Sequence, residues 1–119
     1  MKQKQFKFGE YGVCINPKVV AHLRYTDDDD NDRHNSIFSA SYNGELFFGY
    51  HIETASGSLR AQVQKPSQGN GYPTEYEAVV AAITHLRKNA VSHKMSREDI
   101  IFVFRLCDRA LDEVSPKLF

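Results

Sequence analysis

The chain has 119 residues, of which 41% are hydrophobic and 25% charged, and this composition predicts one compact globular domain. Its 15 lysines and arginines balance 15 acidic residues, so no net charge draws it toward nucleic acid or an anionic membrane. An anion-binding surface would have to be local. No apolar run is long enough for a signal peptide or a membrane span, and we expect a cytoplasmic protein without a membrane partner.

The two cysteines do not have the spacing of a zinc site. Cys14 and Cys107 stand far apart and lack a neighbouring cysteine or histidine at a metal-binding interval. Reduced thiols are therefore expected.

Residues 1–35 are predicted to form an extension that precedes the main domain. Apolar residues alternate on both sides of two glycines near the start, which favours a short hairpin. The run 18–25 is too short for its periodicity to distinguish a strand from one or two helical turns. Aspartates at 27–30, followed by Asp32, repel one another and should bury nothing.

Three antiparallel strands are predicted next. Residues 36–42 and 46–53 flank an Asn-Gly-Glu turn and read as a hairpin. Residues 59–64 alternate apolar and polar side chains, as a strand with one solvated face does. The segments form a meander that ends in a linker with two prolines and two glycines.

A helix is predicted to begin after Thr74. Thr74 and Glu77 have the spacing of a capping box. Apolar residues then recur at helical intervals as far as about Asn89, and they are Tyr76, Val79, Val80, Ile83 and Leu86.

The residues after this helix predict a polar loop, a buried strand and a last helix. Residues 100–106 form a continuous apolar run rich in β-branched and aromatic residues, which is typical of a strand buried on both faces. A helix should follow and end near Pro116. Because a right-handed crossover can place the strand 100–106 parallel to 36–42, the expected α/β (α+β) fold is a meander, a helix, a parallel fourth strand and a C-terminal helix over residues 36–119.

This topology brings two carboxylates to one edge of the sheet. Glu75 lies at the start of the helix and Asp108 follows the fourth strand, at the edge where α/β proteins bind ligands. Carboxylates from separate elements, completed by water and phosphate oxygens, suit Mg²⁺. Acidic residues at helix starts also interact favourably with the helix dipole, so a capping role for both residues stays open.

Three segments resemble the ribonuclease H family. "TEYEAVVAAITHL" resembles the segment that carries the family's metal-binding glutamate, with Glu75 in its place. "IIFVFRLCDRALDEV" resembles the next strand and the aspartate after it, with Asp108 in the metal-ligand position, and "IFSASYNGELFFGYHIE" resembles the first hairpin. The resemblance covers about residues 36–115 and implies a ribonuclease H-like domain.

The family's essential first aspartate has no counterpart. Its place falls on Ser39, Ala40 or Ser41, none of which supplies a carboxylate. We also expect no equivalent of the family's fifth strand or its late aspartate and histidine. Two-metal catalysis needs both ions held about 3.5–4 Å apart. The resemblance therefore implies a degenerate site with no cofactor, or with Mg²⁺ if the site survives.

The expected function is that of a catalytically degenerate accessory module that binds nucleic acid or another protein. The resemblance places Asn70 in a loop that faces nucleic acid in the family. Basic residues modestly outnumber acidic ones between residues 60 and 97, an excess that a solvated surface explains better than nucleic-acid binding does. The candidate nucleic-acid ligands are Asn70, Lys65, Arg60 and Lys88.

Two other functions stay open. One is a Mg²⁺-dependent nuclease acting on RNA:DNA hybrids, with a replacement carboxylate from Glu45, Glu53 or the aspartate run. The other is a homo-oligomeric interaction protein, in which the first 35 residues cover a sheet edge or pair with another copy, because an open edge strand invites pairing.

Overall fold

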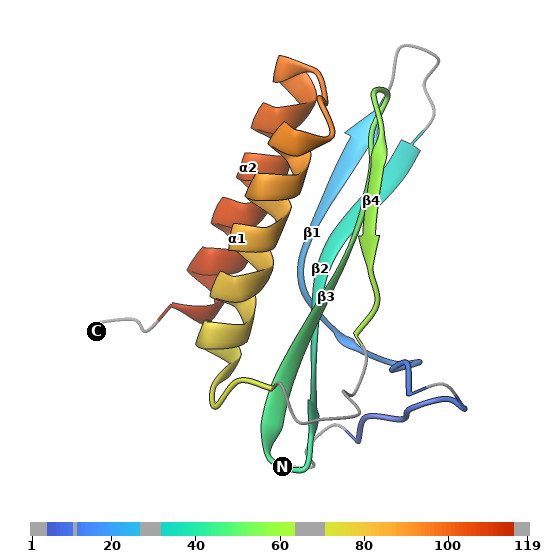
Figure 1. Cartoon of the computed structure of the whole chain (residues 1–119), viewed down its shortest axis with the longest axis vertical. Coiled ribbons are helices and arrows are strands. Elements are labelled where there is room, and N and C mark those ends of the chain that lie inside the picture. Colours follow the sequence, from blue (N-terminus) through green and yellow to red (C-terminus); the bar gives the residue numbers. More distant parts are fainter. Residues whose placement is uncertain (1–4, 11, 27–31, 64–70, 116–119) are drawn as a thin grey trace.

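The computed structural model describes residues 5–10, 12–26, 32–63 and 71–115. They form a small α+β domain of two layers, with a four-stranded antiparallel sheet on one side and two helices on the other (Figure 1). The strand order is β1-β2-β3-β4. The elements are β1 (Lys18–Thr26), β2 (Asp32–Tyr42), β3 (Glu45–Glu53), β4 (Ser58–Ala61), α1 (Glu75–Ser92) and α2 (Arg97–Val114).

The predicted meander is confirmed. β2 and β3 pair from Tyr42 opposite Glu45 to Ser36 opposite His51. Asn43 and Gly44 join them with positive φ angles of 51° and 80°, which is the backbone of the two-residue turn favoured in hairpins. β4 continues the meander beside β3 but ends at Ala61, earlier than expected.

The run after Pro17 is a strand. β1 pairs antiparallel with β2 from Lys18 opposite Ser39 to Thr26 opposite Asp32, with one irregularity near its start. The sheet therefore includes residues from the first 35. The expected hairpin near the N-terminus is reduced to one bridge between Phe8 and Cys14. The aspartates at 27–30 lie outside the described residues.

The predicted helix at Thr74 is confirmed as α1. The Thr74 hydroxyl accepts a hydrogen bond of 3.2 Å from the backbone N–H of Glu77, which satisfies one of the free donors at the helix start. Val79, Ile83 and Leu86 are buried. Tyr76, assigned to the same stripe, is 43% exposed, because at 100° per residue it lies at the flank of the face that contains Ala78, Val79 and Leu86.

The predicted parallel strand at 100–106 is wrong, because these residues form the first half of α2. Ser96 caps the helix by accepting a 3.2 Å hydrogen bond from the Asp99 N–H. Ile101 and Phe104, which a strand buried on both faces would cover, are 47% and 36% exposed. All pairs in the described sheet are antiparallel. The buried residues recur at helical spacing, namely Asp99, Val103, Leu106, Cys107 and Ala110.

Each face of the sheet has its own apolar cluster. The larger one lies between the sheet and the helices and includes Ile37, Ile52, Leu86 and Leu106. A second cluster contains Cys14, Ala40, Phe47 and Val63, with Phe6, Phe8 and Phe38 packed against it. Because Ala40 and Phe47 alternate with helix-facing residues along their strands, this cluster lies on the far face, where the N-terminal segment crosses the sheet (Figure 1). Neither helix is long and apolar enough to span a membrane.

Candidate functional site

Glu75 contacts two side chains from the sheet. Both of its carboxylate oxygens accept hydrogen bonds from the Lys18 ammonium group, at 3.1 and 3.0 Å. One of them also accepts a 2.9 Å hydrogen bond from the Ser39 hydroxyl. Lys18 and Ser39 are register partners in β1 and β2. The cation beside Glu75 is therefore a side chain of the protein.

Asp108 does not join Glu75. It lies in α2, where its carboxylate is 3.4 Å from a guanidinium nitrogen of Arg87. Arg87 and Glu75 are separated by about 18 Å along α1. Of the suggested replacement carboxylates, Glu53 lies within 3.8 Å of Arg33 and 3.5 Å of His51. In the part of the chain that the structure describes, no three metal-binding side chains converge.

A polar surface covers the other end of the sheet, on the face away from the helices. Ile37, Ile52 and Leu59 pack toward the helices, so their neighbours Ser36, His51 and Arg60 face the opposite way. Ser36 of β2 pairs with His22 of β1 on one side and with His51 of β3 on the other. His51 in turn pairs with Arg60 of β4. These four residues form one row across all four strands. We call this row, with Arg24, Asp32, His34 and Glu53, the polar face.

Two histidine rings lie edge to edge at one side of the polar face. His22 and His34 have ring centroids 5.0 Å apart and an interplanar angle of 23°. Their facing nitrogens are 2.9 Å apart, a distance at which one donates a hydrogen bond to the other. Both side chains are exposed. Two adjacent aromatic rings are therefore accessible to solvent.

Charges of both signs surround these rings. Arg24 is paired with Asp32 at 3.6 Å, and 61% of the Arg24 side chain is exposed. The Arg60 guanidinium donates a 3.1 Å hydrogen bond to His51. Because Glu53 also lies beside His51, the polar face is close to neutral overall.

The structure does not bring the predicted nucleic-acid ligands together. Arg60 lies on the polar face, whereas Lys88 is exposed on α1 in the helical layer. Lys65 and Asn70 lie outside the described residues. Sequence reasoning missed His22 and His34, because residues 32–36 are all polar and show no alternation that would mark one face of a strand.

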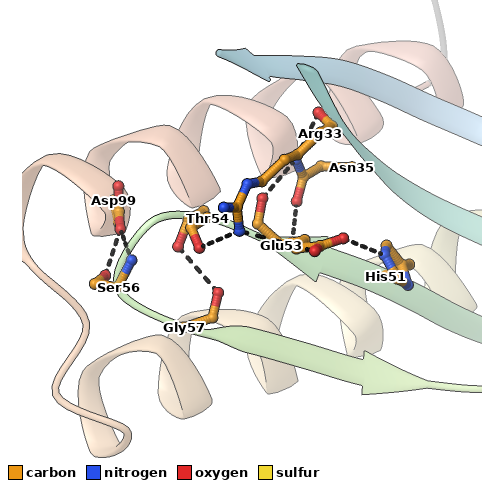
Figure 2. A network of polar contacts seen from close by, with 8 residues as sticks. All are labelled: Arg33, Asn35, His51, Glu53, Thr54, Ser56, Gly57 and Asp99. Carbon is orange, nitrogen blue, oxygen red and sulfur yellow. Dashed lines mark hydrogen bonds and ion pairs between the residues drawn. The ribbon is translucent and has the colours of Figure 1, made fainter. Parts of the chain in front are cut away.

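Asp99 joins α2 to the turn between β3 and β4 (Figure 2). It is 2% exposed, and its carboxylate accepts hydrogen bonds of 2.9 Å from the Tyr25 hydroxyl and the Ser56 backbone N–H. The Ser56 hydroxyl donates a further hydrogen bond. Burial would raise the pKa of Asp99, but hydrogen bonds from Ser56, Thr54 and Tyr25 outweigh it and hold this pKa below its usual value. Burial, followed by the hydrogen bond to Asp99, raises the pKa of Tyr25.

Comparison with known proteins adds no family assignment. The chain matches no protein-family model, and no curated protein or solved structure matches it significantly. The geometry of Glu75 and of the polar face therefore carries the functional argument.

Proposed function

We propose that this protein is a non-catalytic accessory module that binds single-stranded nucleic acid on its polar face. The observation that carries the proposal is the exposed, adjacent pair of His22 and His34, with Arg24 beside it and Arg60 across the row. Unstacked bases bind to aromatic and histidine rings on open sheet surfaces, while arginines contact the phosphates.

The surroundings of Glu75 support a binding role over hydrolysis. A magnesium nuclease needs carboxylate oxygens that are free to accept the ion. Here the Lys18 ammonium contacts both oxygens of Glu75, and Ser39 supplies a hydroxyl at a position where the ribonuclease H resemblance would need a carboxylate. The order of meander and helix fits a degenerate relative of that family, whereas the helical conformation of 100–106 departs from it.

The neutral charge balance of the polar face predicts weak binding. Dissociation constants of roughly 10⁻⁴ to 10⁻⁶ M are typical of sequence-independent binding at physiological salt. Each phosphate contact with a single strand contributes about −0.7 to the slope of log K against log salt concentration. With Arg24 and Arg60 as the phosphate contacts, the slope should be shallow.

Fluorescence anisotropy with a labelled oligothymidylate of about 16 nucleotides tests the proposal. Affinity should fall as salt rises between about 50 and 200 mM. Arg60→Gln should weaken binding and reduce the salt slope by about 0.7, and His34→Ala should weaken it without changing the slope. Lys88→Gln removes the same charge from the helical layer and is the matched control.

Two results would overturn the proposal. Equal losses in Arg60→Gln and Lys88→Gln would mean that binding does not occur on the polar face. Magnesium-dependent cleavage of an RNA:DNA hybrid that is lost in Glu75→Gln would instead identify a nuclease.

A further inference from the structure

A groove runs along the seam between β1 and α2. It consists of three adjoining hollows of about 660, 420 and 360 Å³. The first two share Arg24, Phe102 and Arg105, and the second and third share Arg109. The shared lining residues show that the hollows are neighbours along β1, and we call the three together the β1 groove. It follows β1 from about Ala21 to Thr26.

The β1 groove borders a free strand edge. β1 is the first strand in the sheet order, and its described pairing is with β2 alone. A guanidinium nitrogen of Arg109 donates a 3.2 Å hydrogen bond to the backbone carbonyl of His22, so this carbonyl points away from β2. Because the backbone groups of alternate residues point to the same edge, the N–H and C=O of Arg24 face outward too.

The middle of the β1 groove is basic. Arg24, Arg105 and Arg109 line its central hollow. The acidic residue there, Asp108, is paired with Arg87, and Arg105 has no acidic partner among the described residues. Leu23 and Phe102 supply apolar walls between the charges. Acidic residues line both ends, with Glu98 and the buried Asp99 in the first hollow and Asp112 and Glu113 in the third.

We infer that the β1 groove binds an extended acidic peptide segment, which adds to the sheet as a fifth strand beside β1. The outward backbone groups of His22 and Arg24 would pair with the peptide backbone, as in other cases of strand addition. Acidic side chains of the peptide would face Arg105 and Arg109. The Arg109 guanidinium would then exchange the His22 carbonyl for a peptide carboxylate, a stronger charge-assisted partner.

Two other occupants fit this surface less well. Pairing of β1 with β1 of a second copy, about a two-fold axis at the middle of the strand, would bring the arginines of both copies together. A nucleic-acid strand would meet Asp112 and Glu113 at the far end, and it lacks backbone N–H and C=O groups spaced to pair with a β-strand. A peptide supplies these backbone hydrogen bonds.

The test uses the full chain and a fluorescein-labelled peptide of about eight residues in which valine alternates with glutamate. Anisotropy should show saturable binding that Arg105→Glu weakens at least about tenfold. Arg97→Glu makes the same charge reversal on α2 outside the β1 groove and should leave the affinity unchanged. Hydrogen exchange should show new protection at the Arg24 amide when the peptide binds.

Control peptides separate strand addition from simple charge attraction. A peptide with lysine in place of glutamate should not bind, and one with N-methylated valines, which lacks half the backbone donors, should bind much more weakly. Equal binding by either control peptide, or an unchanged affinity in Arg105→Glu, would overturn the inference. A concentration-dependent dimer that protects the same β1 amides without peptide would also overturn it and would identify a second copy as the occupant.

This experiment is independent of the nucleic-acid proposal. Arg60 lies across the sheet from β1, so Arg60→Gln should leave peptide binding unchanged. Peptide binding that fails while oligothymidylate binding succeeds would overturn the β1 groove alone, and the opposite pattern would overturn the polar face alone. Arg24 belongs to both surfaces, so the variants Arg60→Gln and Arg105→Glu, rather than competition between the ligands, distinguish them.

Discussion

The Lys18 ammonium group lies 3.0 Å from one oxygen of Glu75 and 3.1 Å from the other. This contact joins the first residue of β1 to the first residue of α1 and places a positive charge where the sequence suggested a metal ion. The Lys18 and Glu75 side chains are 48% and 31% exposed, so solvent screens their attraction.

Lys18→Met is therefore expected to change stability very little. The free energy of unfolding should fall by about 1 kcal/mol or less, as for other exposed ion pairs. Urea denaturation, monitored by circular dichroism, measures this change in the free energy of unfolding. Glu75→Gln should give a similar change. In a double-mutant cycle, a coupling well above that size would mean that the pair is more shielded from water than its exposure indicates.

Replacing Asp99 should lower the free energy of unfolding much more than replacing Lys18 does. Asp99→Asn keeps the shape but removes a charged acceptor from the hydrogen bonds of Tyr25 and Ser56. A loss of about 2–3 kcal/mol is expected for buried hydrogen bonds to a charged group. Glu98→Gln, in the same helical turn but exposed, is the matched control and should be nearly neutral.

The Asp99 pKa also predicts how stability depends on pH. Because this pKa is lower in the folded protein than in the unfolded chain, the carboxylate stabilises the fold above the unfolded value of about 3.9. That stabilisation is lost as the pH falls from about 4 through the folded value. The free energy of unfolding, measured by denaturation between about pH 7 and 3, should therefore fall less steeply in Asp99→Asn than in the wild type. The same pH dependence in both proteins would contradict the assignment.

The two faces of α2 should respond differently to truncation. Leu106 is fully buried, and Leu106→Ala should cost about 2–5 kcal/mol. Ile101 is 47% exposed, and Ile101→Ala should cost less than about 1 kcal/mol. A strand buried on both faces would give large losses at both positions, so chemical denaturation of this pair tests the helix directly.

Gly49 should not tolerate a side chain. A Cβ atom at this position would lie 2.7 Å from the Ala61 carbonyl oxygen and 2.7 Å from the backbone nitrogen of Val63. Backbone atoms cannot yield as a flexible side chain does, so Gly49→Ala should destabilise the protein by about 1–3 kcal/mol. At Gly57 the nearest atom would be 3.9 Å away, in Met95, and thermal melting of Gly57→Ala should show no comparable loss.

Cys107 should be inert toward thiol reagents. Burial raises the pKa of its thiol to about 11, and Arg87 only partly opposes this effect. Because the thiolate is the reactive form, a Cys14→Ser variant should incorporate iodoacetamide at Cys107 very slowly at about pH 8 and rapidly in denaturant. Mass spectrometry measures the incorporation. Fast labelling of the folded variant would contradict the prediction and show that α2 opens readily.

The sequence specified most of this fold through local signals. The Asn43–Gly44 turn and the Thr74 cap follow from backbone rules that act within a few residues. Residues 100–106 were wrongly predicted as a strand because apolar residues occupy both faces of this part of α2 and form a continuous apolar run in the sequence. Ser96 and the helical spacing of Val103, Leu106 and Ala110 were the signals for a helix. Short apolar runs are ambiguous until their flanking residues are weighed.

The site was less predictable because it depends on contacts between distant segments. The predicted metal site at Glu75 required a parallel strand at 100–106. The actual partner of Glu75 is Lys18, from β1, a segment whose apolar periodicity does not distinguish a strand from a helix. The polar face likewise requires His22 and His34 to lie diagonally across two strands. The proximity of these two residues depends on the register between β1 and β2, which cannot be determined from a local sequence pattern.

The packing of α2 against β1 joins segments from opposite ends of the chain. During synthesis, Ala21, Leu23 and Tyr25 would have no helix to cover them until residues through Val114 have left the ribosome. A partly made chain would therefore expose an apolar surface beside an open strand, a combination that favours aggregation. Completion of α2 is thus the step that ends this exposure, because its buried face then covers these residues.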